Sequence, residues 1–479
     1  MIIDENTVFN LWDTNGRRSD VLNALDQYLS ILDDLQNDDP SWTWENYPNS
    51  LSQFNFYKEA IERSPDIFRK HPIYDKFVDI LRTDYEKFAE RDSKWIVSKF
   101  DRSSFDSHDS MRDTLDKAIE ARARHYTSNL VRFGFTDAQR RITPAGNSFL
   151  KSTIQKDSIE ALLPLGTENL LILRQLMKLR IYSKTDDNNN MYYYSPFFMA
   201  IHLLLGNYVI DSSDFSSIIQ GLNPYIKEDD KETVKHCKPK DIENIFLDKI
   251  TSSSIPTCFS QKEKVVQSIF QEYIKNRKSG KTEERYYKFY SSLYEFVFEN
   301  SEENYEVLRN VYHSNKDKIK KAFTLRKNIF DFGTNEVSSM MTFIVKDADN
   351  PFLTKDNFNS AFYMAYLKSK YIDIIKEYSD TTMRMFGSTG LFRFKNGLPS
   401  LVYKDLFSVV FSKIDIGSKI FGVSTKDEYL AYEVNEKSTF GSSCSFHDIL
   451  GYSEIDVEEL IEQVKNKLYT VEDKRLKKN

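Results

Sequence analysis

The sequence is poor in the residues on which several protein classes depend. Three cysteines in 479 residues cannot build a disulfide framework, which favours a reducing, cytoplasmic location. Fifteen glycines and twelve prolines are too few for collagen-like, β-helical or many-turned all-β architectures. No apolar run approaches the roughly 18 residues of a membrane helix, and the N-terminus has no secretory signal. We therefore expect a cytoplasmic protein with no membrane partner.

Apolar residues are plentiful and follow helical spacing. Hydrophobic residues make up 40% of the chain and aromatic residues 14%, which excludes disorder of the whole chain. At about 150 residues per domain, the length corresponds to roughly three domains. Helical periodicity extends through most segments, for example His71–Phe100 and Asn357–Glu377, whereas strand-like pieces are short. The sequence therefore predicts a mainly α protein with several subdomains.

Charged residues are unevenly distributed. The net charge of -6 does not by itself indicate nucleic-acid binding. The first 50 residues hold ten acidic residues against two arginines, a net of -8. Met111–Lys151 holds eight basic and four acidic residues, and Arg384–Lys404 holds four basic and no acidic ones, so each window carries +4. A basic window is usually only a solvated face of the protein. Whether these two windows indicate nucleic-acid binding therefore depends on the local structure that each one forms.

The two basic windows follow the same order of elements. In the first, a helix over Met111–Val131 leads to Gly134, a polar hairpin spans Thr136–Arg141, and a new helix opens at Thr143 and Pro144. In the second, a helix ends near Met385, Gly390 follows, Asn396-Gly397 joins two short strands, and a helix resumes near Lys404. Asn-Gly is a strong hairpin signal. This order is typical of a winged helix-turn-helix, so we expect two such units.

A third segment, Ser195–Leu222, outlines a helix-turn-helix. Ser195 before Pro196 is a helix start signal, the turn falls at Gly206-Asn207, and a second helix starts near Ser213. Taken with the two windows, these features divide the chain as follows: a helical N-terminal region (1–105), a winged-helix recognition subdomain (106–186), a helix-turn-helix subdomain (187–255), a helical linker region (256–350), a second winged-helix-like subdomain (351–410) and a C-terminal linker or docking segment (411–479).

Winged helices suit double-stranded DNA because a helix fits the major groove while the wing reaches the backbone. The apolar positions of Met111–Val131 face inward, which leaves polar side chains for the bases, and arginine pairs well with guanine. The residues expected to contact DNA are Arg122, Arg124, His125 and Ser128 on the first helix, Arg140 and Arg141 on its wing, Thr381, Thr382 and Arg384 on the second helix, and Lys395 and Asn396 at the second wing tip. Winged helices also bind proteins, and that interpretation stays open.

Four segments resemble one family in the correct order. Arg122–Leu150 (RARHYTSNLVRFGFTDAQRRITPAGNSFL) resembles a stretch near the start of AlwI-type type IIS restriction and nicking endonucleases. Leu170–Tyr182, Tyr194–Leu205 and Tyr378–Gly397 resemble later segments of that family. Trp12–Arg17 also resembles a stretch of it, which adds Arg17 to the expected DNA contacts. The resemblance covers about 110–400 and implies recognition of a short asymmetric duplex site within a restriction system that includes a methyltransferase.

In that family, a C-terminal nuclease domain with a PD-(D/E)xK motif holds the Mg²⁺ that activates water. Only 76 residues follow position 403, which is too few for such a domain. Pro65-Asp66 and Asp92–Lys94 have a permissible spacing but lie in helical sequence. The sequence therefore offers no convincing nuclease site, and the catalytic residues stay unknown. We expect no metal site or cofactor in this chain, which would be a recognition subunit or a recognition half, with cleavage by a separate Mg²⁺-dependent nuclease domain or subunit. Two alternatives stay open: a winged-helix regulator or partner-binding protein, and a complete nuclease with a divergent site.

Overall fold

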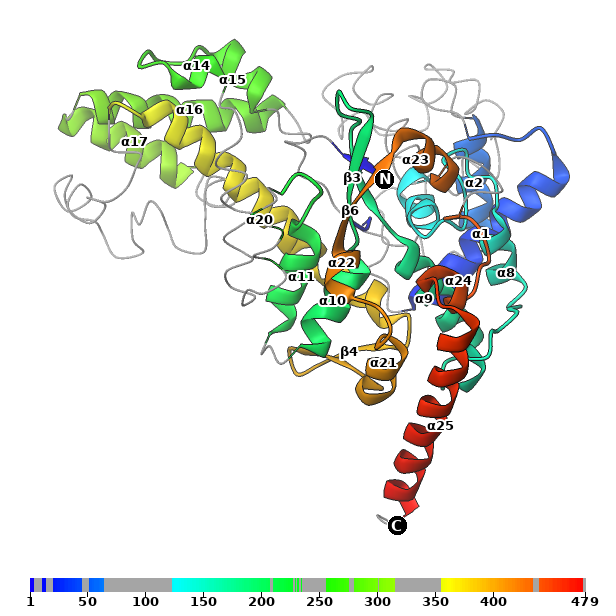
Figure 1. Ribbon diagram of the computed structural model, residues 1–479. Helices are drawn as coiled ribbons and strands as arrows, with labels where there is room; N and C mark the ends of the chain where they lie inside the picture. The colour runs from blue at the N-terminus through cyan, green and yellow to red at the C-terminus, as the bar shows by residue number, and fades with distance from the viewer. Residues whose placement is uncertain are drawn as a thin grey trace. The chain divides into compact units, whose positions relative to one another are not determined.

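The computed structural model describes residues 1–3, 11–13, 20–44, 51–63, 123–206, 210–226, 256–274, 280–299, 301–314, 355–433 and 439–476, together with 229, 231 and 234. Over these residues the protein is mainly helical with few strands, as the sequence predicts (Figure 1). The chain forms two compact units. The first unit comprises Met1–Glu5, Asn10–Pro239 and Tyr378–Asn479, and the second comprises Asn6–Phe9 and Lys240–Glu377. No helix of the described part is long and apolar enough to cross a membrane.

The first unit contains a four-stranded sheet that the sequence analysis does not predict. Its strand order is β1 (Ile2–Ile3), β2 (Ile181–Ser183), β3 (Asn190–Tyr194) and β6 (Phe421–Thr425). β1 pairs with β2 in parallel, and the other two pairings are antiparallel. The sheet joins strands from four of the predicted subdomains, and β2 and β3 pair across the boundary expected near 187. The structure thus groups these segments into one unit.

One helix of the first unit, α9 (Thr167–Lys178), is almost fully buried. Every residue of α9 from Leu170 to Lys178 is buried, including three polar ones. The other helical elements of this unit are α1 (Val21–Asp38), α2 (Leu51–Arg63), a helix over 123–132, α8 (Pro144–Leu150), η3 (Glu160–Leu162), α10 (Pro196–Leu205), α11 (Ser212–Gly221), the end of α20 (Phe358–Gly387), α21 (Lys404–Val410), α22 (Ile416–Ile420), α23 (Lys426–Glu433), α24 (Phe446–Leu450) and α25 (Glu454–Leu476). Of these, α8, α10 and α24 pack against α9.

Helix starts in this unit agree with the local sequence signals. Pro144 begins α8, and the Thr143 hydroxyl accepts a hydrogen bond from the Gly146 N–H at 3.2 Å. Pro196 begins α10, although the Ser195 hydroxyl bonds to the Leu179 carbonyl instead of capping the helix. The two helices of the predicted helix-turn-helix are present as α10 and α11, and residues 207–209 between them lie outside the described part. Because nearly all of α11 is buried, however, this helix cannot present a reading face to DNA.

The second unit is built from α14 (Thr257–Ser260), α15 (Gln267–Tyr273), α16 (Gly280–Phe298), α17 (Glu302–Ser314) and the first part of α20. Its core is mostly aromatic. The buried Tyr290 hydroxyl accepts from the Val265 N–H and donates to the Asn359 side chain. The Asn359 amide in turn donates to the carbonyls of Gln261 and Glu263. These bonds satisfy polar groups that the apolar core would otherwise leave unpaired.

The C-terminal segment, expected as a linker or docking element, contains a long helix. Ile455–Leu468 lies within α25, which extends away from the rest of the first unit in Figure 1. Leu460 and Val464 are buried, and α25 packs against α21 and η3. Lys413 forms ion pairs with Asp456 and Glu459 on the first turns of α25. The beginning of α25 is therefore part of the first unit.

Candidate nucleic-acid interface

The first basic window forms a helix, a glycine turn, a short hairpin and a second helix. The helix over 123–132 leads to Gly134, whose φ of 66° suits glycine best. A single bridge between Thr136 and Ile142 closes the hairpin, and α8 follows. The predicted Met111–Val131 helix is thus seen from 123 onward, and its earlier residues lie outside the described part.

The second basic window repeats this order. The end of α20 leads to Gly390 with a φ of 70°. β4 (Phe392–Lys395) pairs with β5 (Leu398–Leu401), and α21 follows. Asn396 and Gly397 both have positive φ values, of 54° and 74°, as the two-residue turn of a twisted hairpin requires. The Asn-Gly signal therefore predicts this hairpin correctly.

One backbone hydrogen bond occurs at the same place in both windows. The Thr143 N–H donates to the carbonyl of Phe135, the residue after Gly134, at 3.0 Å. The Val402 N–H donates to the carbonyl of Leu391, the residue after Gly390, at 2.9 Å. In each case the bond ties the chain entering the second helix to the turn that follows the first. The two windows thus share local hydrogen bonding as well as element order.

Both windows are anchored to α9. The Gln175 side-chain amide donates to the Phe133 carbonyl at 2.6 Å, next to Gly134. The Asn169 side-chain amide donates to the Ser388 carbonyl at 2.7 Å, close to Gly390. Asn169 and Gln175 are six residues apart, which corresponds to about 9 Å along a helix. Two segments separated by about 250 residues in sequence are therefore attached to the two halves of one buried helix.

A C-terminal loop, Thr439–Ser443, closes over the first window. The Lys178 ammonium donates to the carbonyls of Thr439, Phe440 and Ser442 at 3.2, 3.1 and 2.7 Å. Gln175 and Arg174 donate to the carbonyls of Phe440 and Ser443, and the Ala145 N–H donates to Gly441. These three polar residues of α9 are not among the functional residues expected from the sequence. The sequence does hold a sign of their role, because three strong hydrogen-bond donors occur in a segment that is otherwise rich in leucine. Buried donors of this kind require buried acceptors.

Lys178 makes stability depend on pH in a defined direction. Burial lowers its pKa to about 8, whereas the pKa of an unfolded lysine is about 10.4. Between these values the unfolded chain binds more protons, so the free energy of unfolding rises with pH. We expect the stability of the wild type relative to Lys178→Met to increase by about 1.5 kcal/mol from about pH 8 to pH 9.5. Urea denaturation measures this difference, and a constant value would contradict a buried ammonium.

Several residues expected to contact DNA lie on the surface of the first unit. Arg124, Arg141, Lys395 and Asn396 are exposed, and His125 and Ser128 are half-buried. Arg384 is half-buried as well, and its guanidinium pairs with Asp380 at 2.8 Å. Arg17 and Arg122 lie outside the described residues. Arg393, which the expected set omits, is exposed on β4 two residues from Lys395.

Three residues of the expected set are inside the protein, which corrects their assignment as DNA contacts. Arg140 is buried with its guanidinium 4.7 Å from the centre of the Trp44 ring, and it donates to the Thr127 hydroxyl and the Ala138 carbonyl. Burial lowers its pKa to about 10. Thr381 and Thr382 are fully buried, with hydroxyls that have no hydrogen-bond partner among the described residues. A wing tip or reading helix needs exposed side chains, which these three residues do not provide.

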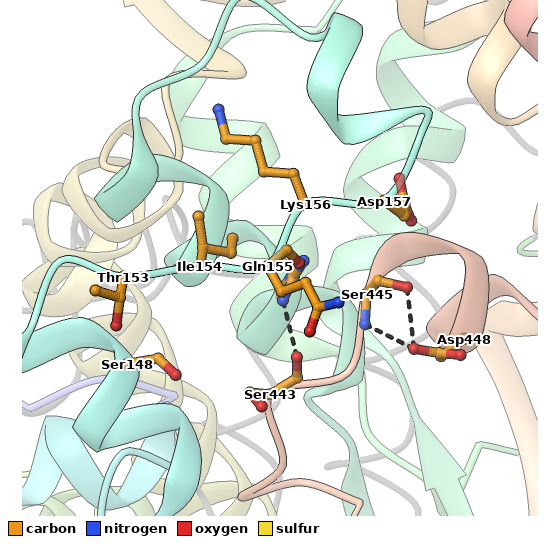
Figure 2. A pocket seen from close by; sticks show the side chains of 10 residues that line it. Ser148, Thr153, Ile154, Gln155, Lys156, Asp157, Ser443, Ser445 and Asp448 are labelled. Atoms are coloured by element: carbon orange, nitrogen blue, oxygen red, sulfur yellow. Dashed lines mark hydrogen bonds between the residues drawn. The ribbon is translucent and has the colours of Figure 1, made fainter.

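A polar hollow of about 540 Å³ is the other candidate site of the first unit (Figure 2). Its lining comprises Ser148, Thr153–Asp157, Arg174, Ser443, Ser445 and Asp448. Arg174 is buried there, and all three of its nitrogens already donate to Glu160, Ser443 or Gln155. Ser445 and Asp448 bond to each other (Figure 2). These charges stabilise the fold, which leaves the basic windows as the stronger candidate.

No family model, curated protein or solved structure matches this chain. Within the described residues, no group of three or more histidine, cysteine, aspartate or glutamate side chains could hold a metal ion. Pro65-Asp66 and Asp92–Lys94 lie outside those residues. The element order and the exposed basic side chains of the two windows are therefore the basis for a proposed function.

Proposed function

We propose that the first unit binds double-stranded DNA at a short site through two winged-helix-like units, each made of one basic window. One observation carries the proposal. The β4–β5 hairpin exposes Arg393, Lys395 and Asn396 within a stretch of the chain, 384–404, that contains no acidic residue. Exposed cations without nearby acids in the same segment are what binding to a phosphate backbone requires.

Strand geometry explains why these cations share one face. Side chains alternate along a strand, so Arg393 and Lys395 point to one face while Phe392 and Phe394 point to the other. Both phenylalanines pack against Phe215 on α11, and Phe392 also packs against Phe197 on α10 and Phe386 on α20. The aromatic contacts hold the hairpin to the unit. Its charged face is thereby presented as a preformed wing.

The helix over 123–132 supplies the second element of the proposal. Arg124 is exposed on this helix, and Arg141 is exposed on the hairpin that follows. Arginine can make paired hydrogen bonds to guanine in the major groove. We assign base contact to the helix and backbone contact to the hairpins, because wings generally position a protein while helices read sequence.

The resemblance of Arg122–Leu150 and the later segments to AlwI-type endonucleases supports a wider role. We propose that this chain is the recognition part of a restriction system, with a separate Mg²⁺-dependent nuclease as partner and a methyltransferase protecting the same site. Nicking of plasmid DNA by the purified chain with Mg²⁺ alone would contradict a separate nuclease. Binding of a defined duplex without cleavage is the expected result.

The test of DNA binding is the double variant Arg393→Ala/Lys395→Ala. We expect its affinity for a duplex selected from random DNA to fall about tenfold at about 100 mM salt, because two phosphate contacts are lost. The slope of log K against log salt should decrease in magnitude by about 2, at roughly 0.9 per contact. Fluorescence anisotropy between about 50 and 200 mM salt measures both quantities.

The matched control is Lys426→Ala/Lys467→Ala, which removes two exposed cations of the same unit from α23 and α25. We expect this variant to keep the wild-type salt slope. Equal losses in the two double variants would mean that overall charge, and not the hairpin, determines binding. Absence of duplex binding by the wild type would contradict the proposed function itself.

A further inference from the structure

Asp13 is a buried carboxylate that the helix over 123–132 holds in place. The Asp13 N–H donates to the Asn129 side-chain oxygen at 2.9 Å, and the Asn129 amide donates back to the Asp13 carbonyl at 3.4 Å. The preceding Trp12 ring stacks on Phe133 with ring centres 4.7 Å apart. The Leu11 N–H donates to Gln220 at 3.1 Å. These contacts leave Asp13 little freedom to move.

The Asp13 carboxylate is directed at His125. Its Oδ2 lies 2.7 Å from Nδ1 of His125. The Asp13 side chain is 9% exposed, whereas the His125 side chain is 43% exposed, so the ring forms the solvent side of the pair. Because an ionised carboxylate only accepts hydrogen bonds, Nδ1 carries a proton and Nε2 is the second ring nitrogen. No hydrogen bond to Nε2 is found among the residues that the structure describes.

The charges near this pair favour an anion. His125 shares its helix with the exposed Arg124 and with Arg132. Burial lowers the pKa of Arg132, and the negative charge of Asp13 offsets part of this shift. Tyr378 faces Arg132. Arg140 of the adjoining hairpin faces Asp137 as well as Arg124. Among these groups of the described part, Asp13 and Asp137 are the acids and three arginines are the bases. A half-exposed imidazole in such surroundings is suited to bind phosphate oxygens.

We propose that His125 binds a DNA phosphate through Nε2 as an imidazolium, and that Asp13 is the positioning residue that orients the ring. The proposal rests on the proposed DNA-binding function. Contact with the phosphate requires a second ring proton, which is taken from solvent and bound at Nε2 as the complex forms. No covalent bond between heavy atoms changes. DNA binding by this protein is therefore coupled to the uptake of a proton, and affinity falls as pH rises.

The experiment measures duplex affinity at constant ionic strength between about pH 6 and pH 8. For the wild type we expect a decrease of about fivefold over this range, within the limit of about tenfold per pH unit for one proton. His125→Gln should bind with less than about a twofold change, because it has no titrating ring. Asp13→Asn should lose most of the pH dependence, since its amide no longer holds the ring as a carboxylate does.

Three outcomes separate this inference from the function on which it rests. A wild-type affinity that is independent of pH would overturn the histidine contact while leaving DNA binding intact. Full pH dependence in a folded Asp13→Asn variant would overturn the positioning role of Asp13. If Asp13→Asn does not fold, as a thermal melt would show, the half-exposed His125→Gln decides alone. Arg393→Ala/Lys395→Ala serves as the comparison, with lower affinity but the same fold-change with pH.

Discussion

Replacing Glu160 by alanine is expected to destabilise the protein by about 3–5 kcal/mol, because it leaves the buried Arg174 without its counter-ion. Both side chains are almost inaccessible, with exposed fractions of 0% and 2%. Glu160 accepts two bonds from the Arg174 guanidinium, at 2.6 and 2.5 Å. It also accepts from the N–H groups of Asp157 and Phe446. The substitution therefore breaks a network that joins 155–160 to the start of α24.

Urea denaturation of three variants would measure this effect. Glu459→Ala is the matched control, because its ion pair with Lys413 lies at the surface of the same unit, where solvent screens the attraction and the pair should contribute little to stability. The double variant Glu160→Leu/Arg174→Met should recover most of the lost stability, since it leaves no unpaired buried charge. Equal losses for Glu160→Ala and Glu459→Ala would show that the buried pair is unimportant.

Gly134→Ala is expected to cost about 2–4 kcal/mol, more than the same change at the corresponding glycine of the second window. Both glycines have a φ near 70°, so alanine is strained by about 1–2 kcal/mol at either position. At Gly134 a Cβ would also lie 2.9 Å from the Phe440 carbonyl oxygen and 3.0 Å from the Gln175 amide. At Gly390 the nearest atom is the end of the Leu165 side chain at 3.2 Å, which can move.

Thermal or urea unfolding of both variants tests this difference. Gly397→Ala is the control for backbone strain alone, because its φ is 74° and no atom of the described residues lies within 4 Å of the methyl group that alanine would add. We expect a cost of about 1 kcal/mol there and an intermediate value at Gly390. Similar losses at all three glycines would mean that the Thr439–Ser443 loop does not hold the first window closely.

Short-range signals predict the local structure of the windows well. Thr143 and Pro144 start α8, and Asn396-Gly397 turns the β4–β5 hairpin, because capping and positive φ depend on residues only a few positions apart. The strands β1 and β6 escape prediction since each is short and pairs with a segment far away in sequence. No local pattern contains that information.

In the candidate site, too, the sequence predicts local features but not which side chains are buried. Arg140 and Arg141 are neighbours in a polar turn and look equivalent in sequence, yet one stacks on Trp44 inside the protein while the other is exposed. Thr381 and Thr382 follow a charged segment but are fully buried. Asp13 and His125 are 112 positions apart and carry no motif that would pair them. Burial and long-range contacts decide which charges remain available to a ligand.

The sequence by itself determined the mainly helical class, the two basic windows and their order of helix, glycine, hairpin and helix. These features depend on composition and on interactions between near neighbours, which the order of residues specifies directly. Only the tertiary structure decided that Asn169 and Gln175 attach both windows to α9, and that the loop at Thr439–Ser443 covers the first of them. Such contacts depend on which distant segments pack together, because buried polar groups must find partners wherever the fold brings them.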